Sequence, residues 1–392
     1  MMKQAVILAA GEGQRLRPFT VTKPKAMIAI AGKPILQYVV EALARNGIRN
    51  IVIVVGYRRE QVFNYMGSGE RFGVNITYIT QERQLGTAHA LMQVSKAVQD
   101  EFLVLPGDNL IEANTIAKFV SARPDTVLVK SVENTARYGV VTTEGDMVQS
   151  IQEKPREAEC DIINTGIYAF SKRVFDFIAA ELAIPDVINN MIAQGCGVSA
   201  QETEGTWLDA VYPWDILSLN NAILSRIPPN LGGTIEAGAS VKGVVSIGKD
   251  TIIRSNSYIF GPVVIGENCD IGPNVCILPA TSIGDNVVIS PFSDIENSVI
   301  GDDVNIGPGA IIQDSVIDES CLIEGRFTAS SGEVEVRIND EFHQVKVGAM
   351  LGVGCNLKNS VSAQPGTIIG NYAQVQAMKL LSGRIPDRSN IF

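Results

Sequence analysis

The two halves of the chain carry different spacings of apolar residues. Up to about residue 211, short runs rich in β-branched and aliphatic residues alternate with segments of helical spacing. Most segments between these runs are long enough for a crossover helix, so the alternation predicts an α/β domain with a mainly parallel sheet. The runs that we predict as strands are residues 5–8, 50–55, 75–79, 102–105 and 126–131.

In the second half, apolar residues recur every six positions behind a breaker cluster at residues 228–233. A small or β-branched residue stands four positions after each of them, and a glycine often follows directly. This hexapeptide pattern predicts a parallel β-helix, in which each short strand directs one aliphatic side chain inward. The aliphatic positions are Ile235, Val241, Ile247, Ile253, Ile259, Ile265, Ile271, Ile277, Ile283, Ile289 and Ile295.

The hexapeptide register is interrupted at three places. It slips by one residue at Ile300 and again at Ile317. Charged and β-prone residues then replace the pattern, which predicts an excursion or a hairpin near 325–346. The six-residue spacing resumes at Val345.

The overall composition is that of a globular protein with an acidic balance. The 392 residues allow a large core, and we expect a first domain over residues 1–229 and the β-helix over 230–392. The net charge of −10 argues against a nucleic-acid partner, which would require a basic face. The apolar run 5–10 is too short for a signal peptide, and no run reaches the length of a membrane span, so we expect no membrane partner and a cytoplasmic protein.

A glycine turn follows the first predicted strand. The apolar run breaks into Gly11 and Gly13, and cations follow at Arg15 and Lys25. The glycines let backbone N–H groups approach an anion closely, and the cations supply the charge that a polyphosphate needs. The turn is neither a Walker A loop nor a dinucleotide fingerprint, because it lacks Gly-Lys-Ser/Thr and a third glycine. Taken alone, these residues also fit an ordinary tight turn.

A carboxylate follows another predicted strand. Asp108 comes after the strand at 102–105, and ligands of parallel sheets bind at the carboxyl ends of the strands. Beside a phosphate-binding turn Asp108 is a candidate Mg²⁺ ligand, since Mg²⁺ takes one or two carboxylates together with phosphate oxygens. In isolation it would be interpreted as a turn residue or a helix cap.

Six ordered motifs resemble those of the sugar-1-phosphate nucleotidylyltransferases, and they cover essentially the whole first domain. The resemblance implies a Rossmann-like nucleotidyltransferase domain. In chain order, the motifs are residues 8–18 with 23–25, Gln81 with 85–90, Gly107-Asp108, Tyr138-Gly139, 153–155 with 164–166, and Trp207-Leu208-Asp209.

The resemblance also implies the chemistry. A sugar-1-phosphate oxygen attacks the α-phosphorus of a nucleoside triphosphate, and pyrophosphate leaves. The nucleophile is already an anion, so the protein must supply positive charge rather than a general base. In this interpretation Arg15 and Lys25 bind the triphosphate, Lys154 binds the sugar phosphate, and Asp108 with Asp209 bind Mg²⁺. Each residue also has a structural alternative as a surface cation, a turn residue or a helix cap.

The substrates implied by the resemblance stay open between close alternatives. The nucleotide is UTP or dTTP, which differ at the base by one methyl group that pockets reject weakly. The sugar phosphate is glucose-1-phosphate or N-acetylglucosamine-1-phosphate. His89 is expected to be a packed or locally hydrogen-bonded histidine. Nucleotide contacts are expected at Leu8, Ala10, Gly11, Gly13, Gln81, Gly86 and Thr87, and sugar contacts at Gly139, Glu153 and Asn164.

The second half resembles the left-handed β-helix of hexapeptide acyltransferases, which are usually trimers, so we expect a homotrimer or a multiple of three. Bifunctional enzymes with this layout also acetylate an amino-sugar-1-phosphate with acetyl-CoA. Their base histidine and their tyrosine correspond to Gly309 and Ile312 here, and His343 in the excursion is a weak substitute. A bifunctional enzyme and a non-catalytic regulatory paralogue are the two alternatives to a plain nucleotidylyltransferase. The paralogue would have a broken phosphate site, whereas this chain retains all five candidate residues.

Overall fold

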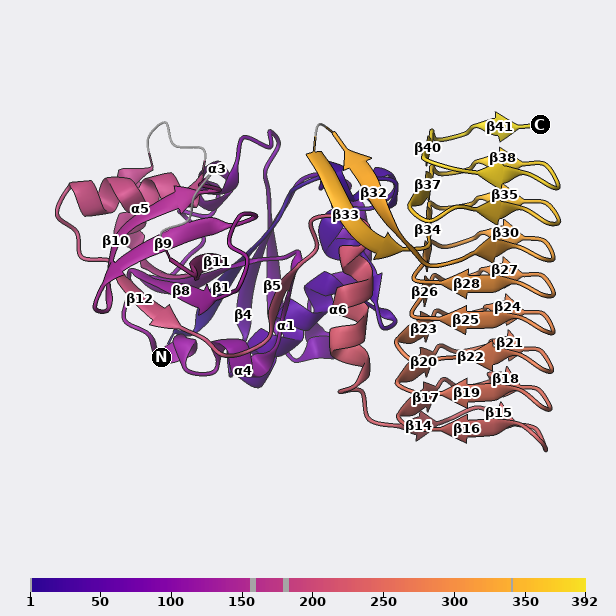
Figure 1. The fold of residues 1–392 in the computed structure, drawn as a ribbon. Helices are drawn as coiled ribbons and strands as arrows, with labels where there is room; N and C mark the ends of the chain where they lie inside the picture. The colour runs from indigo at the N-terminus through magenta and orange to yellow at the C-terminus, as the bar shows by residue number, and fades with distance from the viewer. Residues whose placement is uncertain (1, 156–159, 179–182, 340) are drawn as a thin grey trace. The chain divides into compact units, whose positions relative to one another are not determined.

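The chain folds into two compact units, shown in Figure 1. The computed structural model describes residues 2–155, 160–178, 183–339 and 341–392. The first unit comprises residues up to 12, 24–27 and 35–209, and the second comprises 13–23, 28–34 and 210–392. Two short N-terminal segments therefore belong to the same unit as the C-terminal half. The sequence boundary between residues 229 and 230 stays a prediction, since the compact units divide the chain differently.

A mixed sheet forms the centre of the first unit. Among the described residues seven of its nine strands share one direction, and only β10 and β11 run the opposite way. Four strand pairings are parallel and five are antiparallel, and the predicted parallel arrangement is found in the run β5-β4-β1-β6 and in the pair β8–β12. The strand order is β5 (Asn75–Thr80), β4 (Asn50–Val55), β1 (Gln4–Ala9), β6 (Glu101–Pro106), β11 (Ile162–Ser171), β8 (Thr126–Ser131), β12 (Ser199–Glu202), β10 (Met147–Glu153) and β9 (Gly139–Glu144).

The central strand β1 is buried on both faces. Ala5 and Ile7 pack into one hydrophobic core, whereas Val6 and Ala10 pack into another, because successive side chains of a strand point to opposite faces. Helix α1 packs against the first core and α3 and α5 against the second. The five predicted strands are confirmed within one residue at each end, whereas β9 to β12 were not predicted.

Helices and short strands complete this unit and the start of the second. The α-helices are α1 (Ile35–Arg45), α2 (Arg59–Met66), α3 (Thr87–Met92), α4 (Ala113–Ile116), α5 (Ile184–Ala193) and α6 (Asp215–Leu224). The 3-10 turns are η1 (Gln14–Leu16), η2 (Phe19–Val21), η3 (Lys25–Met27), η4 (Glu70–Phe72), η5 (Phe119–Ser121) and η6 (Lys172–Phe177). Two short pairs are β2 (Ala29–Ile30) with β3 (Lys33–Pro34), and β7 (Asn109–Ile111) with β13 (Trp207–Asp209).

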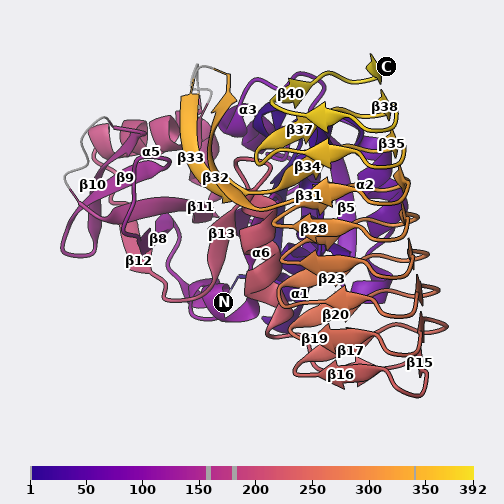
Figure 2. The same ribbon diagram turned by 45° about the vertical axis from the view of Figure 1, so that its right-hand side comes forward.

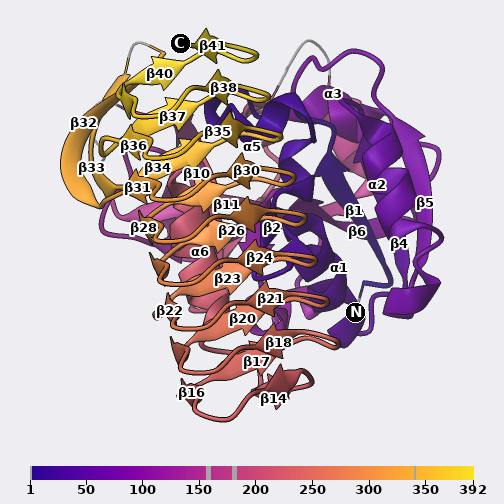
Figure 3. The same cartoon turned by 90° about the vertical axis from the view of Figure 1, so that its right-hand side faces the viewer.

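The second unit contains three parallel sheets whose strands alternate along the chain, which is the arrangement of a β-helix and is consistent with the predicted left-handed form (Figure 3). The first sheet is β14 (Asn230–Leu231), β17 (Val245–Ile247), β20 (Val263–Ile265), β23 (Thr281–Ile283), β26 (Val299–Ile300), β29 (Val316–Ile317), β34 (Ala349–Leu351), β37 (Thr367–Ile369) and β40 (Arg384–Ile385). The second is β15 (Thr234–Ile235), β18 (Ile252–Ile253), β21 (Asp270–Ile271), β24 (Val288–Ile289), β27 (Asn305–Ile306), β30 (Leu322–Ile323), β35 (Asn356–Leu357), β38 (Gln374–Val375) and β41 (Asn390–Ile391). The third is β16 (Ser240–Lys242), β19 (Tyr258–Phe260), β22 (Cys276–Ile277), β25 (Asp294–Glu296), β28 (Ile311–Gln313), β31 (Thr328–Ala329), β36 (Ser362–Ala363) and β39 (Leu380–Leu381).

The predicted aliphatic positions form the core of the β-helix. Those from Ile247 to Ile295 are buried in a single cluster, and Ile300 and Ile317 stay in this cluster despite the register slips. Ile235 and Val241, at the start of the β-helix, are partly buried and pack against it.

The excursion is a hairpin of β32 (Gly332–Ile338) and β33 (Glu341–Val347), which leaves the stack of coils (Figure 2). Residue 340 lies outside the described residues. The hairpin begins later in the sequence than predicted, because residues 328–329 form β31, which still pairs with β28 of the β-helix. Val345 is part of the hairpin and not of a coil, so the hexapeptide spacing does not resume there.

We expect Ile289→Ala to lower the free energy of unfolding by about 2–5 kcal/mol, the usual cost of emptying a packed core site. Ile289 is 1% exposed, whereas Val288, its neighbour on β24, is 39% exposed. Val288→Ala should therefore change the stability by less than about 0.5 kcal/mol. Denaturant titrations followed by circular dichroism measure both values, and equal losses would contradict this assignment of inward and outward positions.

Candidate active site

Two carboxylates predicted as metal ligands come together through a short strand pair. β13 runs antiparallel to β7, and Asp209 is the register partner of Asn109. Asp108 immediately precedes β7 and follows Gly107, whose backbone N–H donates to Leu8 O at 2.9 Å. The strand pair thus places Asp108 and Asp209 close together beyond the carboxyl ends of β1 and β6, although they are far apart in sequence.

Lys25 joins the two carboxylates. Its Nζ lies 2.6 Å from Asp108 Oδ2 and 2.9 Å from Asp209 Oδ1, and its side chain is 14% exposed. Burial opposes the charged form of Lys25, but attraction to Asp108 and Asp209 outweighs it and raises the pKa of the ammonium above its ordinary value. Lys25 therefore carries its positive charge throughout the neutral pH range.

The carboxylate pair fits a divalent cation of the Mg²⁺ class. Mg²⁺ is usually bound by one or two carboxylates and completes its octahedron with water and phosphate oxygens. Asp108 and Asp209 would supply two such carboxylates, and both already lie beside the ammonium group of Lys25. Within the described part of the chain no cluster of three or more His, Cys, Asp or Glu residues is suited to a metal, so a metal held by Asp108 and Asp209 would complete its coordination with water or substrate oxygens.

The sequence analysis assigned no role to Asn109, but in the structure this residue orients Asp108. With its amide nitrogen facing Asp108, it donates to Oδ1 at 3.0 Å and its oxygen accepts from Trp207 Nε1 at 3.3 Å. Trp207 Nε1 also lies 2.9 Å from Thr165 O. The sequence signal was the Gly-Asp-Asn order at a strand end, but the partner strand that makes it meaningful lies about a hundred residues away.

Asp209 does not cap the helix that follows it. Helix α6 starts at Asp215 and its N-cap residue is Trp214, while Asp215 Oδ2 accepts the backbone N–H groups of Val211 and Tyr212 at 2.8 Å in the turn before the helix. The helix-cap alternative for Asp209 is therefore wrong, and its ion pair with Lys25 is the interaction that the structure shows.

The predicted base-contacting residues lie together at the start of α3. Gln81 is buried, and its Nε2 lies 3.1 Å from Gly86 O and 2.8 Å from His89 Nδ1. Gly86 has φ of +113°, a conformation that favours glycine, and it directly precedes Thr87 at the first position of the helix. Thr87 Oγ1 accepts the backbone N–H of Ile184. His89 is locally hydrogen-bonded, as expected.

The predicted sugar-contacting residues lie on β9, β10 and β11. Gly139 pairs with Glu153, and a Cβ on Gly139 would lie 3.0 Å from Glu153 Oε1. Lys154 has φ of +42°, and its backbone N–H donates to Tyr138 O at 3.1 Å. Glu153 is exposed, and partial desolvation raises the pKa of its carboxyl against the attraction of Lys154.

Asn164 stands at an irregularity in β11, where the register with β8 shifts. Its Oδ1 accepts the backbone N–H of Gly166 at 3.0 Å, and its Nδ2 lies 2.7 Å from the Tyr168 hydroxyl. Burial raises the pKa of Tyr168, and the charge of Glu153 raises it further. Asn164, Tyr168 and Glu153 therefore interact electrostatically in one region of the sheet.

The predicted phosphate-binding turn is divided between the two units. Leu8, Ala10 and Gly11 belong to the first unit, where Ala10 O accepts the backbone N–H of Tyr57 at 3.2 Å. Gly13 and Arg15 belong to the second unit. Gly13 has φ of +75°, and Arg15 Nη2 lies 3.9 Å from Oε1 of Glu341 in the hairpin.

Comparison with known proteins identifies the family. A model of the nucleotidyl transferase family matches residues 4–226, more than half of the chain. The chain belongs to this family. Within the β-helix of this nucleotidyl transferase, residues 259–385 match a second model, the GMPPB C-terminal domain.

Known relatives cover more than half of this nucleotidyl transferase chain, and one covers nearly all of it. The bifunctional protein GlmU of Methanococcus maripaludis is 31% identical over 409 residues, covering 99% of this chain and 97% of the relative. A glucose-1-phosphate thymidylyltransferase of Streptomyces antibioticus is 33% identical over 282 residues, covering 68% of this chain and 79% of the relative. A solved structure, a putative glucose-1-phosphate thymidylyltransferase from Bacillus anthracis in complex with sucrose, is 30% identical with a TM-score of 0.52 and covers 56% of this chain and 94% of that chain.

The structure also bears on the membrane prediction. Among the described residues, no helix combines the length and the apolar character needed to cross a membrane.

We expect Glu153→Gln to raise the thermal unfolding midpoint at pH 7. The pKa of Glu153 is higher in the folded protein than its ordinary value of 4.5. At a pH above this raised pKa, Glu153 is charged, and its charge lowers the free energy of unfolding. The gain should shrink as the pH falls toward 4.5, where both states become protonated. Thermal unfolding between pH 4.5 and pH 7 measures this, with Glu144→Gln, an exposed position on β9, as the matched control. A gain of the same size at every pH would contradict this prediction.

Proposed function

We propose that this nucleotidyl transferase moves a nucleoside monophosphate from UTP or dTTP to glucose-1-phosphate or N-acetylglucosamine-1-phosphate and releases pyrophosphate. The observation that carries the proposal is the cluster of Lys25 with Asp108 and Asp209, which combines a buried cation with two metal-type carboxylates. The relatives named GlmU and glucose-1-phosphate thymidylyltransferase support the substrate class.

The chemistry requires two anions to meet. An oxygen of the sugar phosphate attacks the α-phosphorus in line, the bond from this phosphorus to the bridging oxygen breaks, and that oxygen leaves with pyrophosphate. The phosphate nucleophile needs no general base, so the main task of the protein is charge neutralisation and orientation. We propose that Arg15 and Lys25 neutralise the triphosphate and that Lys154 receives the sugar phosphate.

We propose Mg²⁺ as the cofactor, held by Asp108 and Asp209. When bound, Mg²⁺ supplies positive charge to the phosphate oxygens of the triphosphate. Asn109 holds Asp108 in place by its amide N–H, and the strand pair β7–β13 fixes Asp209. Lys25 lies at ion-pair distance from both carboxylates, so its charge offsets the repulsion between them.

For the substrates, we propose that Gln81, Gly86 and Thr87 contact the base and that Gly139, Glu153 and Asn164 contact the sugar. The Asn164 amide is already held by Gly166 and Tyr168, so its orientation is fixed before a sugar binds. Gln81 is likewise fixed by Gly86 and His89. Contacts that are ordered in advance reduce the entropic cost of binding.

The packing of His343 does not favour this residue as the base for acetyl transfer by the β-helix. His343, the alternative base, has its ring packed 4.2 Å from that of Tyr212 and 5.6 Å from that of Trp214. Its Nε2 is buried and lies 3.5 Å from Glu341 Oε2. A base has to reach the amine that it deprotonates, and this ring faces an aromatic pair instead.

Pyrophosphate release tests the proposed function. The protein is incubated with Mg²⁺, with UTP or dTTP, and with glucose-1-phosphate or N-acetylglucosamine-1-phosphate. We expect release with at least one pair and no release without the sugar phosphate. If no pair gives pyrophosphate, the proposed function is wrong.

A matched pair of variants ties that activity to the site. Asp108→Asn should lower kcat by roughly a hundredfold, the usual size of an electrostatic contribution at a reacting phosphate. Asp250→Asn is the control, because Asp250 is an exposed corner of the β-helix that pairs only with its neighbour Lys249 among the contacts described. Equal activity of the two variants would contradict the assignment of Asp108.

We propose that the β-helix also assembles the subunits in threes. The support is the resemblance to trimeric β-helix enzymes, together with large apolar side chains on the outside of the coils, among them Phe260 and Phe292. Light scattering on the purified protein should give three times the chain mass of 42.1 kDa, or a multiple of that value. A mass of one or two chains would contradict the proposal.

A further inference from the structure

The segment that carries the second half of the phosphate-binding turn folds as part of the second unit, together with the β-helix. Residues 13–23 form η1 and η2 and no strand. Their own backbone hydrogen bonds are short-range, such as Leu16 N to Gly13 O at 3.0 Å and Val21 N to Pro18 O at 3.2 Å. The conformation of such a segment depends on contacts with more distant residues of the same unit.

One of these contacts is an ion pair at the end of the segment. Lys23 Nζ lies 2.9 Å from Asp318 Oδ1 and 3.3 Å from Glu319 Oε2, and the side chains of Lys23 and Asp318 are 14% and 12% exposed. Burial lowers the pKa of Lys23, but the two carboxylates outweigh it and the net shift is upward. An ion pair this well buried is costly to break, because either partner would be left as an uncompensated charge.

Asp318 occupies a position where a side chain is unusual. It directly follows the buried aliphatic residue of β29, and the equivalent residue in the other described coils is Gly248, Gly266, Gly284, Gly301, Gly352 or Gly370, with Pro386 in the last coil. A Cβ on Gly248 would lie 2.4 Å from Gly266 O, and one on Gly284 would lie 2.2 Å from Asp302 Oδ1. The stacking of coils therefore favours glycine here. Asp318 Oδ1 accepts the backbone N–H of Glu319 at 2.9 Å within the coil and forms the ion pair with Lys23, and a glycine could make neither contact.

A second contact holds the middle of the segment. Asn371 Nδ2 donates to Pro18 O at 3.1 Å, and Asn371 is 1% exposed. The same amide donates to Asp387 Oδ1 at 3.0 Å, while Asn371 Oδ1 accepts the backbone N–H of Val353 at 2.9 Å. The amide has its partners on three sides, so its orientation is fixed by the coils above and below.

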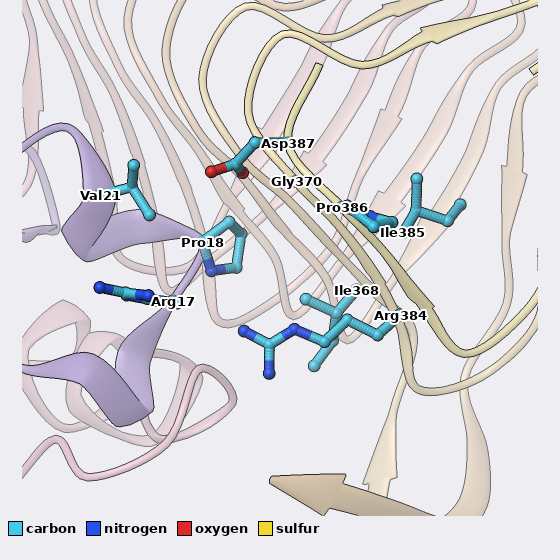
Figure 4. A pocket seen from close by; sticks show the side chains of 9 residues that line it. All are labelled: Arg17, Pro18, Val21, Ile368, Gly370, Arg384, Ile385, Pro386 and Asp387. Carbon is cyan, nitrogen blue, oxygen red and sulfur yellow. The ribbon is translucent and has the colours of Figure 1, made fainter. Parts of the chain in front are cut away.

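The same region contains a cavity of about 190 Å³. Figure 4 shows Pro18 and Val21 on one wall and Ile385 and Asp387, from the end of the β-helix, on the other. The turn segment is therefore held by these polar contacts in addition to its buried side chains, among them Leu16 and Phe19. Loss of one polar contact should loosen the segment without unfolding the β-helix.

We infer that Asp318 and Asn371 are positioning residues for nucleoside triphosphate binding, because they anchor the segment that carries Arg15 and leads directly into Lys25. This inference rests on the proposed function of the turn. It assigns the β-helix a part in nucleotidyl transfer that neither subunit assembly nor acetyl transfer requires. The anchors act through the turn segment and touch no substrate themselves.

Asp318→Gly tests the inference with little risk to the fold, because glycine is the residue that neighbouring coils have at this position. We expect the KM for the nucleoside triphosphate to rise by about tenfold, well within the hundredfold that a misplacement of about 1 Å can cost. The KM for the sugar phosphate should change by less than about twofold, because the predicted sugar contacts lie in the first unit. Initial-rate kinetics with each substrate varied in turn separate the two values.

A double-variant comparison identifies the partner of Asp318. Lys23→Met should raise the KM for the triphosphate to a similar extent, and the combination of both changes should be no worse than either alone. If Lys23→Met raises this KM while Asp318→Gly leaves it unchanged, Lys23 contacts the triphosphate itself and the inference is overturned. Asp285→Asn is the control, because Asp285 accepts a backbone N–H from Glu267 of a neighbouring coil and should leave the kinetics unchanged.

Hydrogen exchange separates this inference from the proposed function. In the free protein, amides of residues 13–23 should exchange faster in Asp318→Gly and in Asn371→Ala than in the parent protein, while amides of the β-helix core keep their protection. This readout needs no substrate, so it stands even if the parent protein releases no pyrophosphate. Unchanged exchange in both variants would overturn the anchoring.

Discussion

The structure of the first unit depends on one ammonium group held between two carboxylates. Lys25 lies at hydrogen-bond distance from both Asp108 and Asp209, which come from the middle and the end of the unit's sequence. Two carboxylates so close together would repel each other, and a buried lysine alone would tend to lose its proton. The ammonium of Lys25 therefore offsets the repulsion between the two carboxylates, and the carboxylates keep Lys25 protonated.

Much of this architecture could be predicted from sequence because burial on both faces leaves a clear pattern. The runs at β4 and β8 coincide with the predicted strands, and the six-residue spacing identified the β-helix core. Strands β9 and β10 were missed because their exposed faces carry polar residues, which weakens the apolar run. The start of the hairpin was placed too early because charged residues near residue 325 lie on a coil that still pairs in the ladder.

The site could be predicted only in part, for a different physical reason. Motif order predicted Asp108 and Asp209 together as metal ligands and Lys25 as a triphosphate ligand, but the ion pairs of Lys25 with both depend on the pairing of β7 with β13, which no local pattern encodes. The role of Asn109 was hidden for the same reason. Asp318 interrupts the series of glycines that follow the strands of the first β-helix sheet. The ion pair that gives it a role involves Lys23, which is 295 positions away in the sequence.

The β-helix fixes the distance between the two residues that anchor the turn segment, Asp318 and Asn371. Asp318 follows β29 and Asn371 follows β37, and these strands are separated in their sheet by β34. Neighbouring strands in a sheet are about 4.8 Å apart, so the anchors are offset by roughly 10 Å along the stack. Gain or loss of a coil elsewhere would leave this offset unchanged, whereas a coil inserted between the anchors would lengthen it by half. The number of repeats is therefore constrained between these two coils and free to vary outside them.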